Sequence, residues 1–139
     1  MQQLKTLARI PRPLGRGGCH YYSKTRIIFS TNTPVAAIKS SFSKYSDYGI
    51  PIFEEEKFYR LPDKKLSLDK IFLDSLDCLT SIRRKVLCAL FFLKHKKKLL
   101  NLDHPEIKKI QEILKGKSIS NYPSFEEIKE KADIYDIKI

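Results

Sequence analysis

The sequence predicts an all-α protein: a small bundle of three to four short helices, preceded by an extended aromatic segment and a cleavable N-terminal presequence. Apolar residues recur at helical spacing from residue 68 onward, and the connections between these stretches are short, which favours antiparallel neighbouring helices. The N-terminal part has a composition of its own. These observations predict a presequence over residues 1–35, an extended or irregular segment over 36–62 and a helical domain over 63–139.

The N-terminal part has the composition of a mitochondrial or plastid transit peptide. The first acidic residue of the chain is Asp47, and the residues before it are rich in lysine, arginine, serine and threonine. On a helix, the first basic side chains share one arc and the first apolar side chains share another. The basic set is Lys5, Arg9, Arg12 and Arg16, and the apolar set is Leu4, Leu7, Ile10 and Leu14. This pattern favours the mitochondrial matrix; an uncleaved basic arm that binds RNA is the alternative.

A candidate processing site follows at residues 26–31. Arg26 stands two residues before a first cut ahead of Ile28, and a hydroxyl residue occupies the fourth position after that cut, as in two-step matrix cleavage. The second cut would then fall before Ala36. Removal of residues 1–35 would take six basic and no acidic residues, and would lower the formal charge from +11 to +5.

The segment 36–62 is too aromatic for a free linker, and glycine and proline interrupt it. Its aromatic residues are Tyr45, Tyr48, Phe53, Phe58 and Tyr59. Soluble monomers avoid so large an exposed apolar patch. The segment is therefore predicted to pack across the helices that follow or to dock on a partner.

The first two helices are predicted from capping residues and apolar spacing. Ser67 is a suitable N-cap for a helix over about residues 68–79. Thr80 or Ser81 can cap the next helix, whose residues 86–93 are apolar on every side and predict its burial. This helix ends in a lysine-rich run over residues 94–98, where cations suit a helix C-terminus.

Two further helices are predicted nearer the C-terminus. Asp103 can cap the third helix, Pro105 suits its first turn, and Gly116 fits its end. The capping box of Ser124 and Glu127 begins the fourth. Residues 134–139 alternate in polarity and could instead form a short strand.

No pattern in the sequence predicts catalysis or metal binding. The cysteines and histidines lack metal-ligand spacing, and there is no GxSxG motif, Walker-type loop or GxGxxG motif. Cys78 and Cys88 lie in apolar contexts and are predicted to be buried thiols. The chain is therefore predicted to be no enzyme, with no cofactor, no metal site and no catalytic residue. Nor does any apolar run approach the roughly 20 residues of a transmembrane helix, so none is predicted.

The excess positive charge is concentrated in one part of the chain. Residues 82–117 carry eleven basic and three acidic residues, whereas the flanking parts of the predicted mature chain are slightly acidic. Clustered lysine and arginine suit phosphate-backbone binding. A contact with anionic lipid and a plain solvated face are the alternatives. The predicted RNA- or polyanion-binding residues are Arg83, Arg84, Lys85, Lys94, Lys96, Lys97, Lys98, Lys108 and Lys109.

In general style the chain resembles accessory proteins of mitochondrial ribosomes and respiratory complexes, which are short, basic and helical. The predicted function is that of a non-enzymatic matrix protein, an accessory component or an assembly or translation factor of the mitochondrial ribosome. Its predicted partners are mitochondrial rRNA and ribosomal proteins. The alternative is a peripheral accessory subunit or assembly factor of an inner-membrane respiratory complex, with peripheral contact to that membrane.

Overall fold

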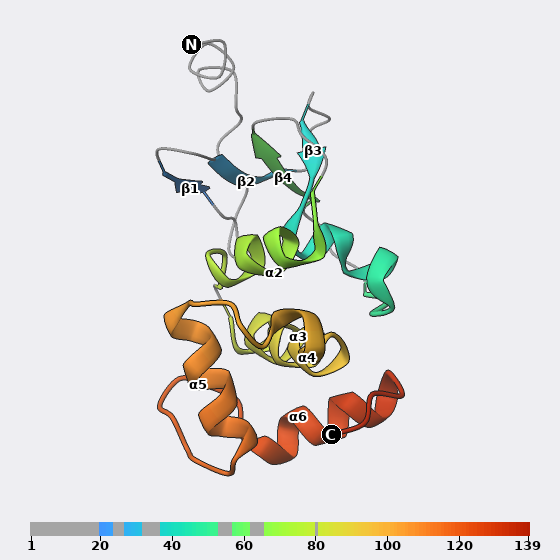
Figure 1. Ribbon diagram of the computed structural model, residues 1–139, viewed down its shortest axis with the longest axis vertical. Helices are drawn as coiled ribbons and strands as arrows, with labels where there is room; N and C mark the ends of the chain where they lie inside the picture. Colours follow the sequence, from blue (N-terminus) through green and yellow to red (C-terminus); the bar gives the residue numbers. More distant parts are fainter. Residues whose placement is uncertain (1–19, 24–26, 32–36, 53–56, 62–65, 80) are drawn as a thin grey trace. The chain divides into compact units, whose positions relative to one another are not determined.

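The computed structural model describes residues 20–23, 27–31, 37–52, 57–61, 66–79 and 81–139 (Figure 1). The chain divides into two compact units, the first ending at Thr80 and the second beginning at Ser81. The first unit holds an antiparallel sheet, a 3₁₀ helix and one α-helix, and the second holds the remaining helices. The first predicted helix, over about residues 68–79, falls in the first unit together with the sheet.

Four short strands form the sheet of the first unit. In chain order they are β1 (His20–Tyr22), β2 (Ile27–Thr31), β3 (Ile38–Lys39) and β4 (Lys57–Leu61). Their order in the sheet is β1-β2-β4-β3, and each neighbouring pair is antiparallel. The longest ladder joins β2 to β4, where Ile27 pairs with Leu61 and Thr31 pairs with Lys57. Strand β2 is therefore paired on both sides.

Every residue of β2 is buried, because the strand contributes to a core on each face. On one face Ile27 and Phe29 pack with Tyr59 and Leu61 of β4, and the rings of Phe29 and Tyr59 stack at 5.7 Å between centroids. Ile28 and Ser30 alternate onto the other face. A strand buried on both faces reads in sequence as a continuous apolar run rather than as alternation.

The second face of the sheet meets the 3₁₀ helix η1 (Ser41–Tyr48) and the helix α2 (Leu68–Leu76), which pack against each other. Phe42 of η1 lies edge-on to Phe58 of β4, with 5.4 Å between ring centroids. The hydroxyl of Ser43 accepts a hydrogen bond from the Phe58 amide at 2.8 Å. This side chain thus pairs a backbone amide that a carbonyl group of a neighbouring strand would otherwise pair. Gly49 ends η1 at φ 91°, a conformation that favours glycine.

A buried carboxylate joins the sheet, η1 and α2. Asp74 of α2 is fully buried, and its Oδ2 accepts from Ser40 Oγ at 2.5 Å and from Arg60 Nη1 of β4 at 3.4 Å. Ser75, the residue after Asp74 in α2, makes a second contact with η1, because its Oγ lies 2.7 Å from the Tyr45 hydroxyl. Burial of an ionised group is costly unless it is paired and hydrogen-bonded, so these contacts fix how the three elements meet.

The prediction of an all-α fold was therefore wrong, and the fold is mixed. Ile27, Ile28 and Phe29 were interpreted as part of a cleavage pattern, whereas they are the first three residues of β2. The aromatic segment was predicted to be extended or irregular; β3 and β4 are extended, and the 3₁₀ helix η1 was not predicted. Strands β2 and β4 pair across about thirty residues of sequence, and local periodicity does not reveal such a pairing.

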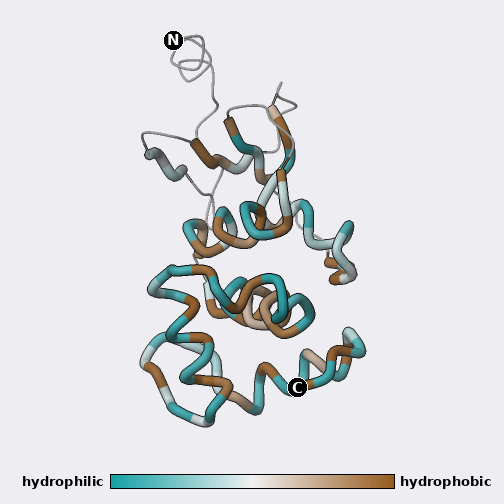
Figure 2. Tube along the Cα trace, viewed as in Figure 1, coloured by the Kyte–Doolittle hydropathy of each residue, from teal (hydrophilic) through white to brown (hydrophobic). Residues whose placement is uncertain are grey.

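The second unit consists of the helices α3 (Ile82–Lys94), α4 (Lys96–Leu99), α5 (Pro105–Leu114) and α6 (Phe125–Ile134). Of these, α3, α5 and α6 lie near the predicted positions, and α4 was not predicted. Helix α3 is buried along most of its length from Val86 to Phe92, and α4 and α6 pack against it. Hydrophobic and hydrophilic residues alternate along α5 and α6 (Figure 2), as expected of helices with one buried face.

The helix ends show which capping predictions hold. Ser81 caps α3 by accepting from the Arg84 amide at 3.2 Å, and Ser124 with Glu127 forms the predicted capping box of α6. Helix α5 is capped by Nδ1 of His104 rather than by Asp103. After α6 the chain turns, and the Ile137 amide donates to the Ala132 carbonyl at 2.8 Å. Residues 134–139 therefore form the last residue of α6, a turn and an irregular end, and not a strand.

The two cysteines predicted to be buried thiols differ in state. Cys78, which follows α2, is buried and disulfide-bonded. Cys88 in the middle of α3 is fully buried and is not disulfide-bonded. The thiol of Cys88 therefore acts as a small core group, as its apolar context indicates.

We expect the substitution Asp74→Ala to destabilise the first unit by about 3–5 kcal/mol, because it leaves the Arg60 guanidinium buried without its carboxylate. The side chain of Arg60 is only 12 % exposed. Hydrogen exchange of β4 and α2 in the full-length chain, with urea unfolding, measures the loss. Asp47→Ala is the matched control, because Asp47 pairs with Lys44 at 3.2 Å but is 63 % exposed. Its loss should stay below about 1 kcal/mol; equal losses would contradict the assigned role.

Candidate polyanion-binding surface

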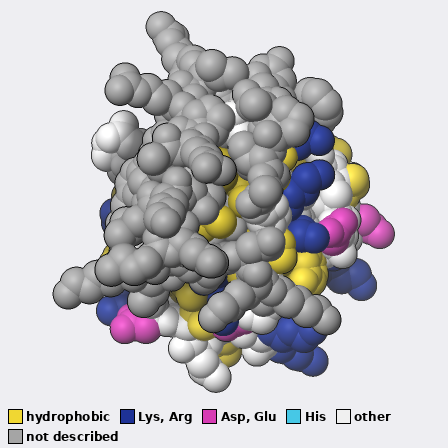
Figure 3. All heavy atoms as spheres, turned by 90° about the horizontal axis from the view of Figure 1, so that it is seen from above, with side chains coloured by type: hydrophobic (Ala, Val, Ile, Leu, Met, Phe, Trp, Pro, Cys, Tyr) yellow, Lys and Arg dark blue, Asp and Glu magenta, His cyan; other side chains and the backbone are white. Residues whose placement is uncertain are grey.

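The structure separates the nine basic residues that were predicted to bind a polyanion into three groups. Four lysines lie together where α3 meets α4. Lys85 and Lys109 contact Tyr122, and the remaining residues lie elsewhere on α3 and α5. Lys and Arg side chains also appear in several separate patches on the face shown in Figure 3. Concentration of charge in the sequence therefore does not amount to a single surface.

The four lysines result from a break between two helices at His95. The His95 backbone has φ −118° and ψ 29°, which ends α3 and begins the short α4. Its amide still donates to the Phe91 carbonyl at 3.1 Å, and its ring lies 4.8 Å from the buried Phe91 ring. Leu99 is fully buried and anchors α4. We name the exposed lysines around this break, Lys94, Lys96, Lys97 and Lys98, the lysine turn.

The lysine turn presents its charges to solvent. All four side chains are exposed, and within the part of the chain that the structure describes none of them forms an ion pair. Residues 93–98 surround a shallow hollow of about 420 Å³. Lys109 and Lys117 of the second unit differ in this respect, because each forms an ion pair with a glutamate. Lys117 lies 2.5 Å from Glu112, and its hydrogen bond, together with its charge, lowers the pKa of that carboxyl group.

Lys85 and Lys109 are held by contacts within the unit. Lys85 Nζ donates to the Asn121 carbonyl at 2.6 Å and lies 4.1 Å from the centre of the Tyr122 ring. Lys109 Nζ lies 5.3 Å from the same ring and 3.5 Å from Glu106 Oε1. The Tyr122 hydroxyl donates to Glu106 Oε2. These cation–π and hydrogen-bond contacts join α3, α5 and the loop before α6, and they engage two of the predicted binding residues.

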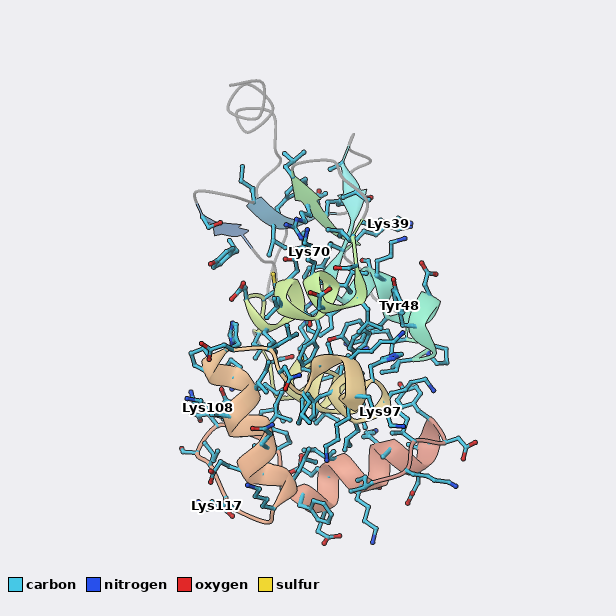
Figure 4. All side chains as sticks on the ribbon, viewed as in Figure 1. Lys39, Tyr48, Lys70, Lys97, Lys108 and Lys117 are labelled. Atoms are coloured by element: carbon cyan, nitrogen blue, oxygen red, sulfur yellow. The ribbon has the colours of Figure 1, made fainter. Side chains whose placement is uncertain are left out.

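The other predicted binding residues lie away from the lysine turn. Arg84 is only 7 % exposed, and Arg83 lies on the first turn of α3, about 16 Å along the helix from Lys94. Arg83 instead borders a hollow of about 350 Å³ between α3 and α6. Lys108 of α5 is exposed, and Figure 4 shows it well apart from Lys97. Charges separated by more than about 8 Å in physiological salt act largely independently.

The aromatic residues that were predicted to dock on a partner lie mainly in the core of the first unit. Tyr45 and Phe58 are fully buried, and Tyr59 is 7 % exposed. Tyr48, labelled in Figure 4, is half-buried. Phe53 lies outside the described residues. The three buried rings pack within the chain and are not exposed to a partner. They therefore do not belong to the candidate surface.

Two residues important to the second unit were missed in the sequence. Tyr122 and Glu106 organise Lys85 and Lys109, although they are sixteen residues apart and belong to different elements. A tyrosine directly before the Pro123–Ser124 helix start is a weak signal of a packed loop. Which side chains this tyrosine contacts depends on the fold, so the sequence alone does not show them. Among the described residues no group of His, Cys, Asp and Glu could hold a metal ion.

No protein-family model, curated protein or solved structure matches the chain. Within the described residues, no helix has both the length and the apolar character needed to cross a membrane. The chemistry of the site itself is then the basis for a functional proposal. Its defining feature is a cluster of exposed cations on short helices that are anchored in a hydrophobic core.

We expect Tyr122→Phe to lower the free energy of unfolding of the second unit by about 1–2 kcal/mol near pH 7, because a hydrogen bond to a carboxylate is lost. Burial, followed by the hydrogen bond and charge of Glu106, raises the pKa of the Tyr122 hydroxyl. Its contribution is therefore complete below the ordinary tyrosine pKa of about 10 and is lost as the pH rises further.

Urea unfolding at pH 7 and at about pH 10.5, followed by hydrogen exchange of α3 and α5, tests this expectation. The wild-type chain should lose more stability between these pH values than the Tyr122→Phe variant. Tyr135→Phe serves as the control, because that hydroxyl makes no hydrogen bond to the described residues. Equal pH dependence of the wild type and Tyr122→Phe would rule out the assigned contact.

Proposed function

We propose that the chain is a non-enzymatic protein of the mitochondrial matrix that contacts RNA of the mitochondrial ribosome through the lysine turn. In this role it is an accessory component or an assembly or translation factor. The observation that carries the proposal is the exposure of four neighbouring lysines that make no ion pair with the described residues. The matrix location is supported by the basic, acid-free segment before Asp47.

The electrostatic energy of the lysine turn is more favourable beside an anionic partner than in the isolated chain. The four lysines lie within five consecutive residues, and their like charges repel one another. Phosphates would remove this repulsion, and each phosphate neutralised by a lysine also releases condensed counterions. The buried Leu99 and Phe91 hold the backbone beneath the lysines, so binding orders little beyond the lysine side chains.

Contact with the phosphate backbone, rather than reading of bases, is the expected mode. Lysine neutralises phosphate as a point charge and presents no flat surface for stacking. The Phe91 ring beside the lysine turn is fully buried against the core and is not accessible to a base. Base stacking on exposed aromatic rings is the usual source of single-strand affinity beyond charge. The proposed binding is therefore sensitive to salt and tolerant of sequence.

One observation favours the alternative of a peripheral protein of the inner membrane attached to a respiratory complex. Leu100 follows α4 directly and is 49 % exposed. Each lysine near an anionic bilayer contributes about 1 kcal/mol, and burial of a leucine contributes about 1.5–3 kcal/mol. RNA is preferred because a single leucine beside four lysines provides little apolar anchorage, whereas the charge density matches a phosphate backbone.

Sedimentation of the tagged full-length protein from gently lysed mitochondria, with and without RNase, distinguishes these possibilities. Co-sedimentation with a ribosomal subunit that is lost on RNase treatment is the expected result. Migration with a respiratory complex, unaffected by RNase, would replace the RNA proposal by the membrane alternative. Migration as a light species in both conditions would count against both assignments.

We expect the triple variant Lys96→Glu, Lys97→Glu and Lys98→Glu to bind a single-stranded RNA oligonucleotide at least about tenfold more weakly than the wild type. The slope of log affinity against log salt should fall by about 2, since each lost lysine–phosphate contact on a single strand removes about 0.7. Fluorescence anisotropy over a series of KCl concentrations measures both quantities. Circular dichroism should show unchanged helicity.

The matched control replaces three other exposed lysines of the second unit, Lys129, Lys131 and Lys138, by glutamate. This variant has the same net charge as the first and leaves the lysine turn intact. Its salt slope should remain close to that of the wild type. If both variants lose slope equally, binding depends on overall charge and the lysine turn is not the contact.

A further inference from the structure

Strand β2 lies inside the segment that the sequence pattern assigned to a removable presequence. Ile28, Ser30 and Thr31 are fully buried, and Ile27 and Phe29 are nearly so. The first predicted cut, before Ile28, falls within this strand, and the second, before Ala36, would remove β1 and β2 together. The same residues thus cannot serve both as discarded sequence and as the centre of the sheet.

Strand β2 is one of the two central strands of the described sheet, and β4, the other, is paired with it along its whole length. It supplies the full-length partner of β4, whereas β3 pairs with only two residues of that strand. Without β2, Phe58, Tyr59 and Leu61 would lose the residues paired with them, and one edge of β4 would be open. Two-stranded remnants of this size are at best marginally stable, and an open apolar edge promotes aggregation.

We infer that the presequence ends ahead of β1 and that Ile27–Thr31 is retained as a strand of the mature protein. The inference rests on the proposed import into mitochondria. The last arginine before β1 is Arg16, and an arginine two residues before the cut places cleavage between Gly17 and Gly18. The step is hydrolysis of the peptide bond between these glycines, in which water supplies the new carboxyl oxygen and the protons of the new termini, by a peptidase that recognises arginine two residues before the cut.

This assignment accounts both for the basic amphipathic pattern of the N-terminal part and for the burial of β2. All four basic residues of the amphipathic pattern, Lys5 to Arg16, precede the proposed cut, so the import signal is complete without β2. Strands β1 and β2 follow it and remain with β4 (Figure 1). The mature chain then keeps Lys24 and Arg26, and its formal charge is +7, because four basic residues and no acidic ones are removed from +11.

Import of the full-length chain into isolated mitochondria, followed by N-terminal sequencing of the recovered C-terminally tagged protein, tests the cleavage position. We expect an N-terminus at Gly18. Arg16→Gln should abolish or displace this cut, and Arg26→Gln, the matched control, should leave it unchanged. An N-terminus at Ile28 or Ala36, or an imported chain that stays uncut, would overturn the inference. Failure of import would instead remove the proposed location, and the cleavage with it.

A second measurement tests the retained strand without reference to import. In the purified full-length chain, Ile28→Asp places a charge at a fully buried position of β2. Amide exchange at residues 57–61 should become at least about tenfold faster, because a buried unpaired charge opens the sheet. Leu7→Asp, the same type of change within the proposed presequence, should leave exchange there unchanged. Unaltered protection of residues 57–61 in Ile28→Asp would show that the mature domain does not depend on β2.

Discussion

The apolar run in α3 is the constraint on which the second unit depends. From Val86 to Phe92 every side chain is buried, so the helix needs cover on all sides and tolerates no charge along its middle. Its charged residues are therefore confined to the two ends. At the first end Arg84 is buried and Lys85 lies against Tyr122, and at the other the lysine turn is exposed. The candidate surface is thus a consequence of how α3 is buried.

The helices of this protein could be predicted because their signals are local. Capping residues such as Ser81 and the box of Ser124 and Glu127 satisfy backbone amides within the same turn, so their effect is visible in a few consecutive residues. The sheet has no such local signal. The all-α prediction failed at β2 because a strand that is buried on both faces lacks alternation, and because β4 lies about thirty residues away. The Asp74 network, which joins three elements, is equally non-local.

For the candidate site, the sequence indicates where charge lies but not which charges are available. Arg84 and Lys85 are neighbours of Arg83 in sequence, yet one is buried in the core and the other contacts a tyrosine from a distant loop. The lysine turn was recognisable because consecutive lysines on a short helix cannot all face the core. Its separation from Lys85 and Lys109 required the positions of Tyr122 and Glu106.

The two interpretations of the N-terminal part are compatible once they are assigned to different residues. Import needs positive charge and an amphipathic pattern, and the sequence supplies both before Gly17. Folding needs buried β-branched and aromatic residues, and β2 supplies several of them. Composition alone merges the two parts, because Lys24, Arg26 and the nearby hydroxyl residues extend the basic character into the sheet. Burial separates them, since a residue at the centre of a core contributes to the stability of the fold whatever its neighbours in sequence resemble.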